Sequence, residues 1–103
     1  MGNKNYNSFI QFYPYYLLEH SKPGTKFFHF IGTSLVIINL IMFFIYIDFI
    51  YLILAPITGY GFAWFSHFFI EKNKPATFKY PIYSLRGDFL MFWHILIGKV
   101  KIF

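Results

Sequence analysis

The chain has no cysteine and few charged residues. Only 13% of its 103 residues are charged, against about 25% in soluble globular domains. The lack of cysteine excludes disulfides and metal sites built on thiolates. Hydrophobic residues reach 57% and aromatic residues 26%, more than a small soluble domain can bury, because small domains bury the smallest fraction of their surface. Composition therefore predicts one membrane domain spanning residues 1–103.

Acidic residues are scarce as well, since four Asp and Glu face nine Lys and Arg and leave a net charge of +5. The basic residues flank the apolar runs, with Lys22 and Lys26 before the first and Lys72 and Lys74 after the second. This distribution fits anionic headgroups and the positive-inside rule better than a nucleic-acid surface. We expect no nucleic-acid partner, contact with membrane lipid, and both termini in the cytosol.

Two long runs carry no charged side chain in their apolar interior. Residues 27–47 reach about the ~30 Å of a bilayer's hydrocarbon core at 1.5 Å per residue, and residues 49–70 form a second run of similar length. Asp48 is the one charge between them. The pattern predicts an all-α, polytopic membrane protein built on an antiparallel transmembrane hairpin with a tight turn at Asp48.

Two shorter helices are expected outside the hairpin. Residues 8–20 place aromatic and apolar side chains at helical spacing, which predicts an N-terminal amphipathic helix at the membrane interface. Pro14 either opens the first turn of that helix or kinks it. A C-terminal helix is predicted over residues 84–98. Its apolar stretch, 89–97, is too short to span a bilayer, so it lies in the interface or packs beside the hairpin.

The predicted hairpin makes two histidines neighbours. His29 lies nineteen positions before Asp48 and His67 nineteen positions after it, which places both at one depth near the cytosolic end. Glu71 follows His67 by one helical turn on the same face. The helix-breaking Pro23-Gly24 pair after His20 allows the first helix to fold back over the site. Imidazoles with a carboxylate suit Fe(II) or Zn. We therefore take these four residues as candidate metal ligands and catalytic residues.

Other interpretations stand beside this one. His29 and His67 could be the axial ligands of a haem, or the chain could be a non-catalytic lipid-binding or assembly protein. Glu71 could equally well pair with a neighbouring lysine. His94 is better explained by headgroup hydrogen bonds than by catalysis. The lysines are expected to anchor headgroups first and to clamp a substrate carboxylate second: Lys22, Lys26, Lys72 and Lys74.

Two segments carry a resemblance to a known family. YYLLEHSKPGTKFFHFIGT and GYGFAWFSHFFIEKNKPATFKYPIYSLRGDFLMFW resemble the short bacterial branch of the membrane 2-hydroxy fatty acid dioxygenases. The eukaryotic branch lies in the endoplasmic reticulum and shortens 2-hydroxy fatty acids derived from phytosphingosine. The shared pattern combines these residues: His20 with Pro23, His29 with Gly32, and His67 with Glu71, Lys72, Pro75 and Ala76.

The resemblance implies an Fe(II)-dependent α-oxidation that uses O₂ to remove one carbon from a 2-hydroxy fatty acid. By motif position it implies that His20, His29 and His67 are the histidines associated with iron, and it assigns no role to His94. It also implies an integral protein of the bacterial inner membrane. A homo-oligomer is compatible with the sequence.

Overall fold

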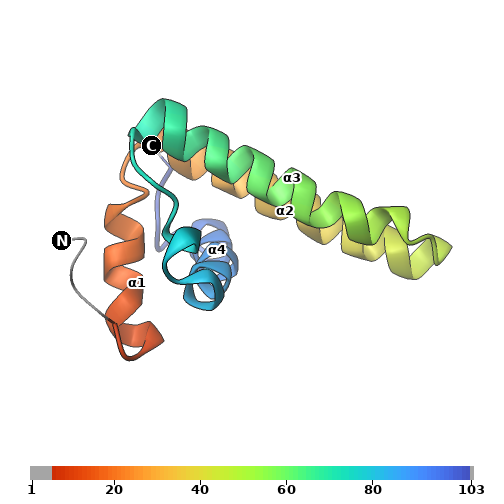
Figure 1. Cartoon of the computed structure of the whole chain (residues 1–103), viewed down its shortest axis with the longest axis horizontal. Helices are drawn as coiled ribbons and strands as arrows, with labels where there is room; N and C mark the ends of the chain where they lie inside the picture. Colours follow the sequence, from red (N-terminus) through yellow and green to blue (C-terminus); the bar gives the residue numbers. More distant parts are fainter. Residues whose placement is uncertain (1–5, 103) are drawn as a thin grey trace.

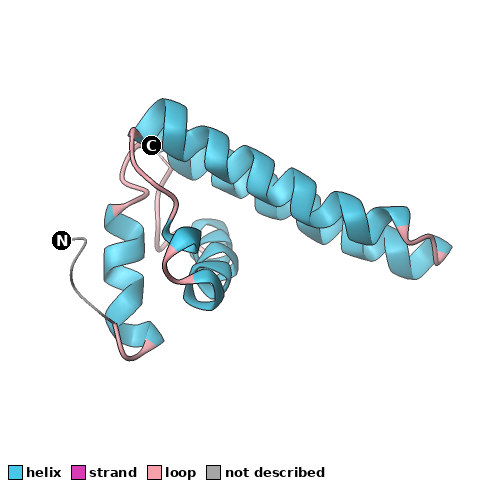
Figure 2. Ribbon diagram, in the orientation of Figure 1, coloured by secondary structure: helices cyan, strands magenta, loops and turns pink. Residues whose placement is uncertain are grey.

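The computed structural model describes residues 6–102. Within that range the chain forms four α-helices and no strand, so the expected all-α class is confirmed (Figure 2). One π-helical and one 3₁₀ segment lie between the third and fourth α-helices. In chain order the elements are α1 (Phe9–Leu18), α2 (Pro23–Tyr46), α3 (Ile50–Ser66), η1 (His67–Glu71), η2 (Ala76–Phe78) and α4 (Pro81–Leu96).

Helices α2 and α3 lie side by side and are joined by a three-residue turn, 47–49 (Figure 1). Glycines let their backbones approach: a Cβ on Gly32 would lie 3.1 Å from the Gly59 carbonyl oxygen, and one on Gly59 would lie 2.6 Å from Val36 Cγ2. Small residues at such contacts are typical of helix pairs in membranes. By length and composition, α2 and the continuous α3–η1 helix are both apolar enough to cross a bilayer.

The helix ends lie close to the predicted ends, with the largest differences at three places. Helix α2 begins at Pro23 rather than at residue 27, and α4 at Pro81 rather than at residue 84, because proline is favoured in a first turn whose N–H groups have no helical partner. The second apolar run is α-helical only to Ser66 and then becomes a π-helix. Pro14 lies inside α1 and does not open it, because Ser8 caps that helix by accepting a hydrogen bond from the Gln11 N–H.

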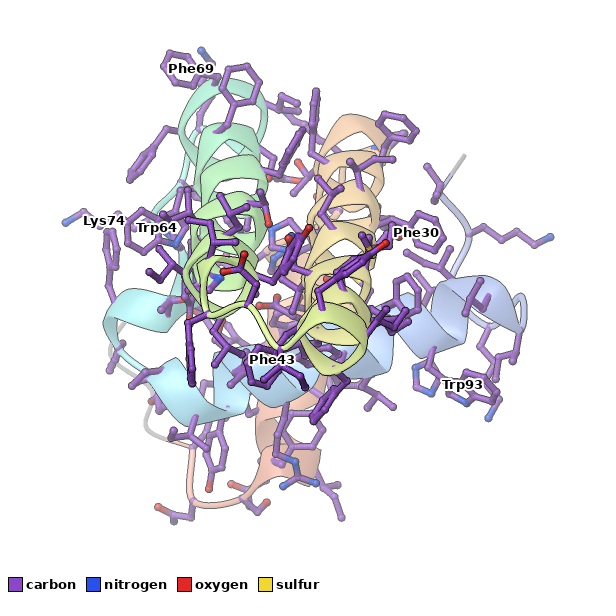
Figure 3. All side chains as sticks on the ribbon, turned by 90° about the vertical axis from the view of Figure 1, so that its right-hand side faces the viewer. Phe30, Phe43, Trp64, Phe69, Lys74 and Trp93 are labelled. Atoms are coloured by element: carbon purple, nitrogen blue, oxygen red, sulfur yellow. The ribbon has the colours of Figure 1, made fainter. Side chains whose placement is uncertain are left out.

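Helices α1 and α4 enclose one end of the α2–α3 pair. Phe12 and Tyr16 of α1 are fully buried against Met91 of α4 and Ala76 of η2. Looking along the pair from its turn, α4 passes beneath both long helices (Figure 3), where Phe92 stacks on Phe30 of α2 with the ring centroids 4.8 Å apart. The fold thus has an enclosed end and a free end, and the enclosed end holds the site.

Candidate metal centre

Three histidines from three parts of the chain converge in the enclosed end. His20 follows α1, His29 lies in the second turn of α2, and His67 opens η1. The Nε2 atom of His67 lies 2.9 Å from that of His20 and 3.2 Å from that of His29. All three side chains are buried, and one ring nitrogen from each lies within 4.8 Å of the other two.

An oxygen acceptor faces the Nδ1 atom of each ring. His20 Nδ1 lies 2.6 Å from the Tyr16 carbonyl oxygen, and His67 Nδ1 lies 2.7 Å from Asn73 Oδ1. The Asn73 amide is itself oriented, because its nitrogen donates to Glu19. His29 Nδ1 lies 3.4 Å from an Asp88 carboxyl oxygen. From these partners we assign the ring proton to Nδ1 in all three histidines.

It follows that three Nε2 lone pairs point at one another. Acceptors cannot hydrogen-bond to acceptors, so a buried cluster of this kind is stabilised by a cation at its centre. Two nitrogens bound at right angles to one ion at about 2.1 Å lie about 3.0 Å apart, close to the observed separations. The donor set therefore fits a divalent first-row ion such as Fe(II) or Zn, with oxygen acceptors orienting each imidazole from behind.

Tyr16 of α1 and Asp88 of α4 supply two of these oxygen acceptors, and they also contact each other. A Cβ on Gly87 would lie 2.9 Å from the Tyr16 ring, so glycine there lets the ring pack on α4 while its hydroxyl donates to Asp88. Burial raises the pKa of Asp88 to about 6, against the opposing effects of the Tyr16 hydrogen bond and of His20 and His67. Burial, and then Asp88, raise the pKa of Tyr16 well above 10.

Burial also sets the charge of His20. It lowers the pKa of this imidazole well below 6.5, and the neighbouring His29 and His67 act in the same direction, while the hydrogen bond to the Tyr16 carbonyl opposes the shift. The ring is therefore neutral at physiological pH. Neutral imidazole is the form that binds a metal ion.

The π-helix η1 brings Asn73 to the cluster. After Glu71 the chain turns sharply at Lys72, which has the left-handed φ of 65°. The Asn73 N–H then donates to the His67 carbonyl at 3.0 Å, which returns the Asn73 side chain to the ring of His67. Single π-helical turns are rare and concentrate at functional sites.

Glu71 does not join the histidine cluster. Its carboxylate accepts the Lys22 backbone N–H at 2.6 Å, where it caps the start of α2 from another helix. The cluster of possible metal ligands in the described chain consists of the three histidines alone. Glu71 thus joins the end of η1 to the start of α2, next to the site.

The remaining candidates lie away from the cluster. Lys22 Nζ donates to the Ile70 carbonyl at 3.0 Å, and Lys26 Nζ donates to the Lys101 carbonyl at 3.2 Å. Lys72 and Lys74 are exposed, and Lys74 points outward in Figure 3. His94 pairs with the Tyr13 hydroxyl at 2.8 Å, where it joins α4 to α1.

Sequence reasoning missed Asp88 and Asn73. Asp88 had a signal: it is the one acidic residue after Glu71 and stands at the edge of an otherwise apolar stretch, where a carboxylate needs a partner. Asn73 had none, because its position depends on a π-helical turn that apolar periodicity does not reveal.

Comparison with known protein families gives a match over nearly the whole chain. The model of a protein family described as "2-hydroxy-palmitic acid dioxygenase Mpo1-like" matches residues 6–100. No curated protein matches the chain, and no solved structure does.

Proposed function

Because the chain belongs to the family of 2-hydroxy-palmitic acid dioxygenase Mpo1-like proteins, we propose that it uses O₂ to shorten 2-hydroxy fatty acids by one carbon. We propose further that His20, His29 and His67 hold an Fe(II) ion for this reaction. The observation that carries the proposal is the convergence of three buried Nε2 atoms, with neighbours 2.9 Å and 3.2 Å apart.

The three histidines leave part of an ion's coordination sphere to other ligands. An iron ion held by these residues would supply the chemistry that activates O₂ and would bind the hydroxyl and carboxylate oxygens of a 2-hydroxy acid. The protein's own contribution is to fix the three rings, which the Tyr16 carbonyl, Asn73 and Asp88 do from behind. Burial of the cluster excludes bulk water from this position.

A membrane location suits this substrate class. We propose that α2 and the α3–η1 helix form a transmembrane hairpin in the bacterial inner membrane, with both termini cytosolic and the turn near Asp48 outside. The lysines before the first apolar run and after the second support this orientation. The chain has no cysteine, so cysteines introduced singly at Asp48 and Lys74 should react with impermeant reagents from opposite sides. Labelling from one side only would exclude the hairpin.

The geometry does not favour the haem alternative. Two axial nitrogens lie on opposite faces of a haem, about 4 Å apart, whereas those of His29 and His67 are 3.2 Å apart and His20 lies beside them. A non-catalytic lipid-binding role leaves the converging nitrogens unexplained.

Protein purified without oxygen tests the proposal. We expect about one iron per chain, no Soret band, and O₂ consumption coupled to release of the carboxyl carbon from 2-hydroxypalmitic acid. Palmitic acid, which lacks the hydroxyl, serves as the matched control and should not react. Iron-loaded protein that consumes no O₂ with the hydroxy acid would refute the reaction, and a Soret band would refute the type of site.

A further inference from the structure

An apolar groove runs between α2, α3 and α4, beside the histidine cluster. Its volume is about 320 Å³, within the ~300–1,000 Å³ range of small-molecule sites. Apolar and small side chains dominate the lining, which includes one carboxylate. The lining residues that carry the argument are Thr33, Val36, Leu40, Ala55, Gly59 and Asp88.

One end of the groove adjoins the candidate metal centre. Asp88 lines the groove and also contacts His29 Nδ1 at 3.4 Å. Thr33 lies one helical turn beyond His29, on the same face of α2. From there the groove follows α2 away from the cluster to Leu40, and Ala55 forms its wall on α3 near the far end. The groove is thus continuous with the site and leads toward the turn.

We propose that this groove holds the first part of the substrate's acyl chain and that Leu40 and Ala55 form its far end. This inference rests on the proposed function. The polar substrate end lies at the Asp88 end of the groove, beside His29, and the chain follows the apolar wall of α2. A single unbranched chain fits a narrow, apolar volume that begins at a polar centre.

The length of the groove sets how much of the chain it covers. From Thr33 to Leu40 the helix rises seven residues, about 10 Å. Carbon–carbon bonds of about 1.5 Å at angles of about 111° advance about 1.25 Å each along an extended chain. The groove therefore covers about eight carbons, and longer chains extend past Leu40 toward the free end of the helix pair.

The opposite face of the pair offers a matched control. A second hollow lies there against Phe28, Ile57 and Phe65. Asp88 and the three histidines are absent from its lining. Ile57 is 60% exposed, so a larger side chain at this position fits without disturbing the helix pair.

The test is a chain-length series with Leu40→Trp and Ile57→Trp. We use 2-hydroxy fatty acids of about eight to about eighteen carbons and measure kcat/KM for each. Crowding at a packed site costs about 1–3 kcal/mol, so Leu40→Trp should lower kcat/KM about tenfold or more for the long substrates and leave the shortest within about twofold. Ile57→Trp should leave the profile unchanged. Equal loss at every length in Leu40→Trp would overturn the inference.

A second readout does not depend on turnover. A 2-hydroxy fatty acid with a photoreactive diazirine at about the tenth carbon, about 10 Å along the chain, should crosslink wild-type protein near Leu40 and Ala55. Crosslinking at Ile57 and Phe65 instead would overturn the inference. Crosslinking at Leu40 and Ala55 without any turnover would leave the groove assignment standing and refute the proposed reaction, so the two failures are distinct.

Discussion

The two ends of the α2–α3 pair differ in what they bury. At the enclosed end, Thr25, His29, Ser66 and His67 are buried polar residues. At the free end seven large apolar residues are exposed, from 46% for Ile50 to 72% for Phe44. The other five are Ile45, Tyr46, Ile47, Phe49 and Ile53.

Within one pair of helices, the enclosed end holds the candidate site and the free end contacts the surroundings of the protein. Soluble monomers rarely expose contiguous apolar patches of more than a few hundred Å², so the free end fits a lipid environment. The enclosed end buries polar groups, and burying such groups costs free energy unless each finds a hydrogen-bond partner or binds an ion. The difference predicts that substitutions at the two ends fail in different ways.

The largest effect is expected at the enclosed end, for His67→Ala. Removal of this ring takes away the nitrogen that lies within 3.2 Å of both other histidines. Iron content should fall to background and turnover by more than about 100-fold, while membrane insertion is retained. His94→Ala is the control, since it removes only the Tyr13 contact. Equal loss of iron in both variants would contradict the site.

The next effect tests the outer surface of the helix pair. Ile38 is 51% exposed near the middle of α2, so Ile38→Lys places a charge where lipid is expected, at a cost of about 2.5–3.5 kcal/mol. Insertion measured by carbonate extraction or glycosylation mapping should fall by about 100-fold in its equilibrium constant. Tyr46→Lys is the control, because a lysine at the helix end reaches the headgroups. Equal insertion of both variants would indicate that Ile38 does not face lipid.

These two variants test features that the sequence predicted. The apolar runs predicted the two long helices, and counting from Asp48 paired His29 with His67, because helices joined by a short turn rise equally on both sides. The outer acceptors were not predicted. Asp88 reaches His29 only through the packing of α4, and Asn73 reaches His67 only through the π-helical turn of η1.

Asp88→Asn tests one of these acceptors, and its expected effect is smaller than those of the two variants above. The amide keeps the shape of the carboxyl group but weakens the acceptor that faces His29 Nδ1. Loss of such a partner costs about 10–100-fold in metal affinity or activity, to be measured as iron affinity by competition with a chelator. Gly87→Ala is a second route to the same end, because its Cβ displaces the Tyr16 ring. Unchanged iron affinity in both variants would exclude an orienting role for Asp88.

The smallest effect is expected for Glu71→Gln. Glu71 accepts the Lys22 N–H at 2.6 Å, a contact that joins two chain segments and holds no imidazole. Glutamine keeps an acceptor oxygen and loses only the charge, and a hydrogen bond to a charged group exceeds a neutral one by about 1 kcal/mol. Iron content and turnover should therefore stay within a few-fold of wild type.

Glu71→Ala removes the cap and should lower the thermal midpoint, with iron still bound in the folded protein. If both variants lose iron as completely as His67→Ala, the carboxylate binds the ion directly and the three-histidine centre is incomplete. If Gln retains iron and Ala retains it with lower stability, Glu71 supports the link between α2 and η1, and the site needs no carboxylate among its direct ligands.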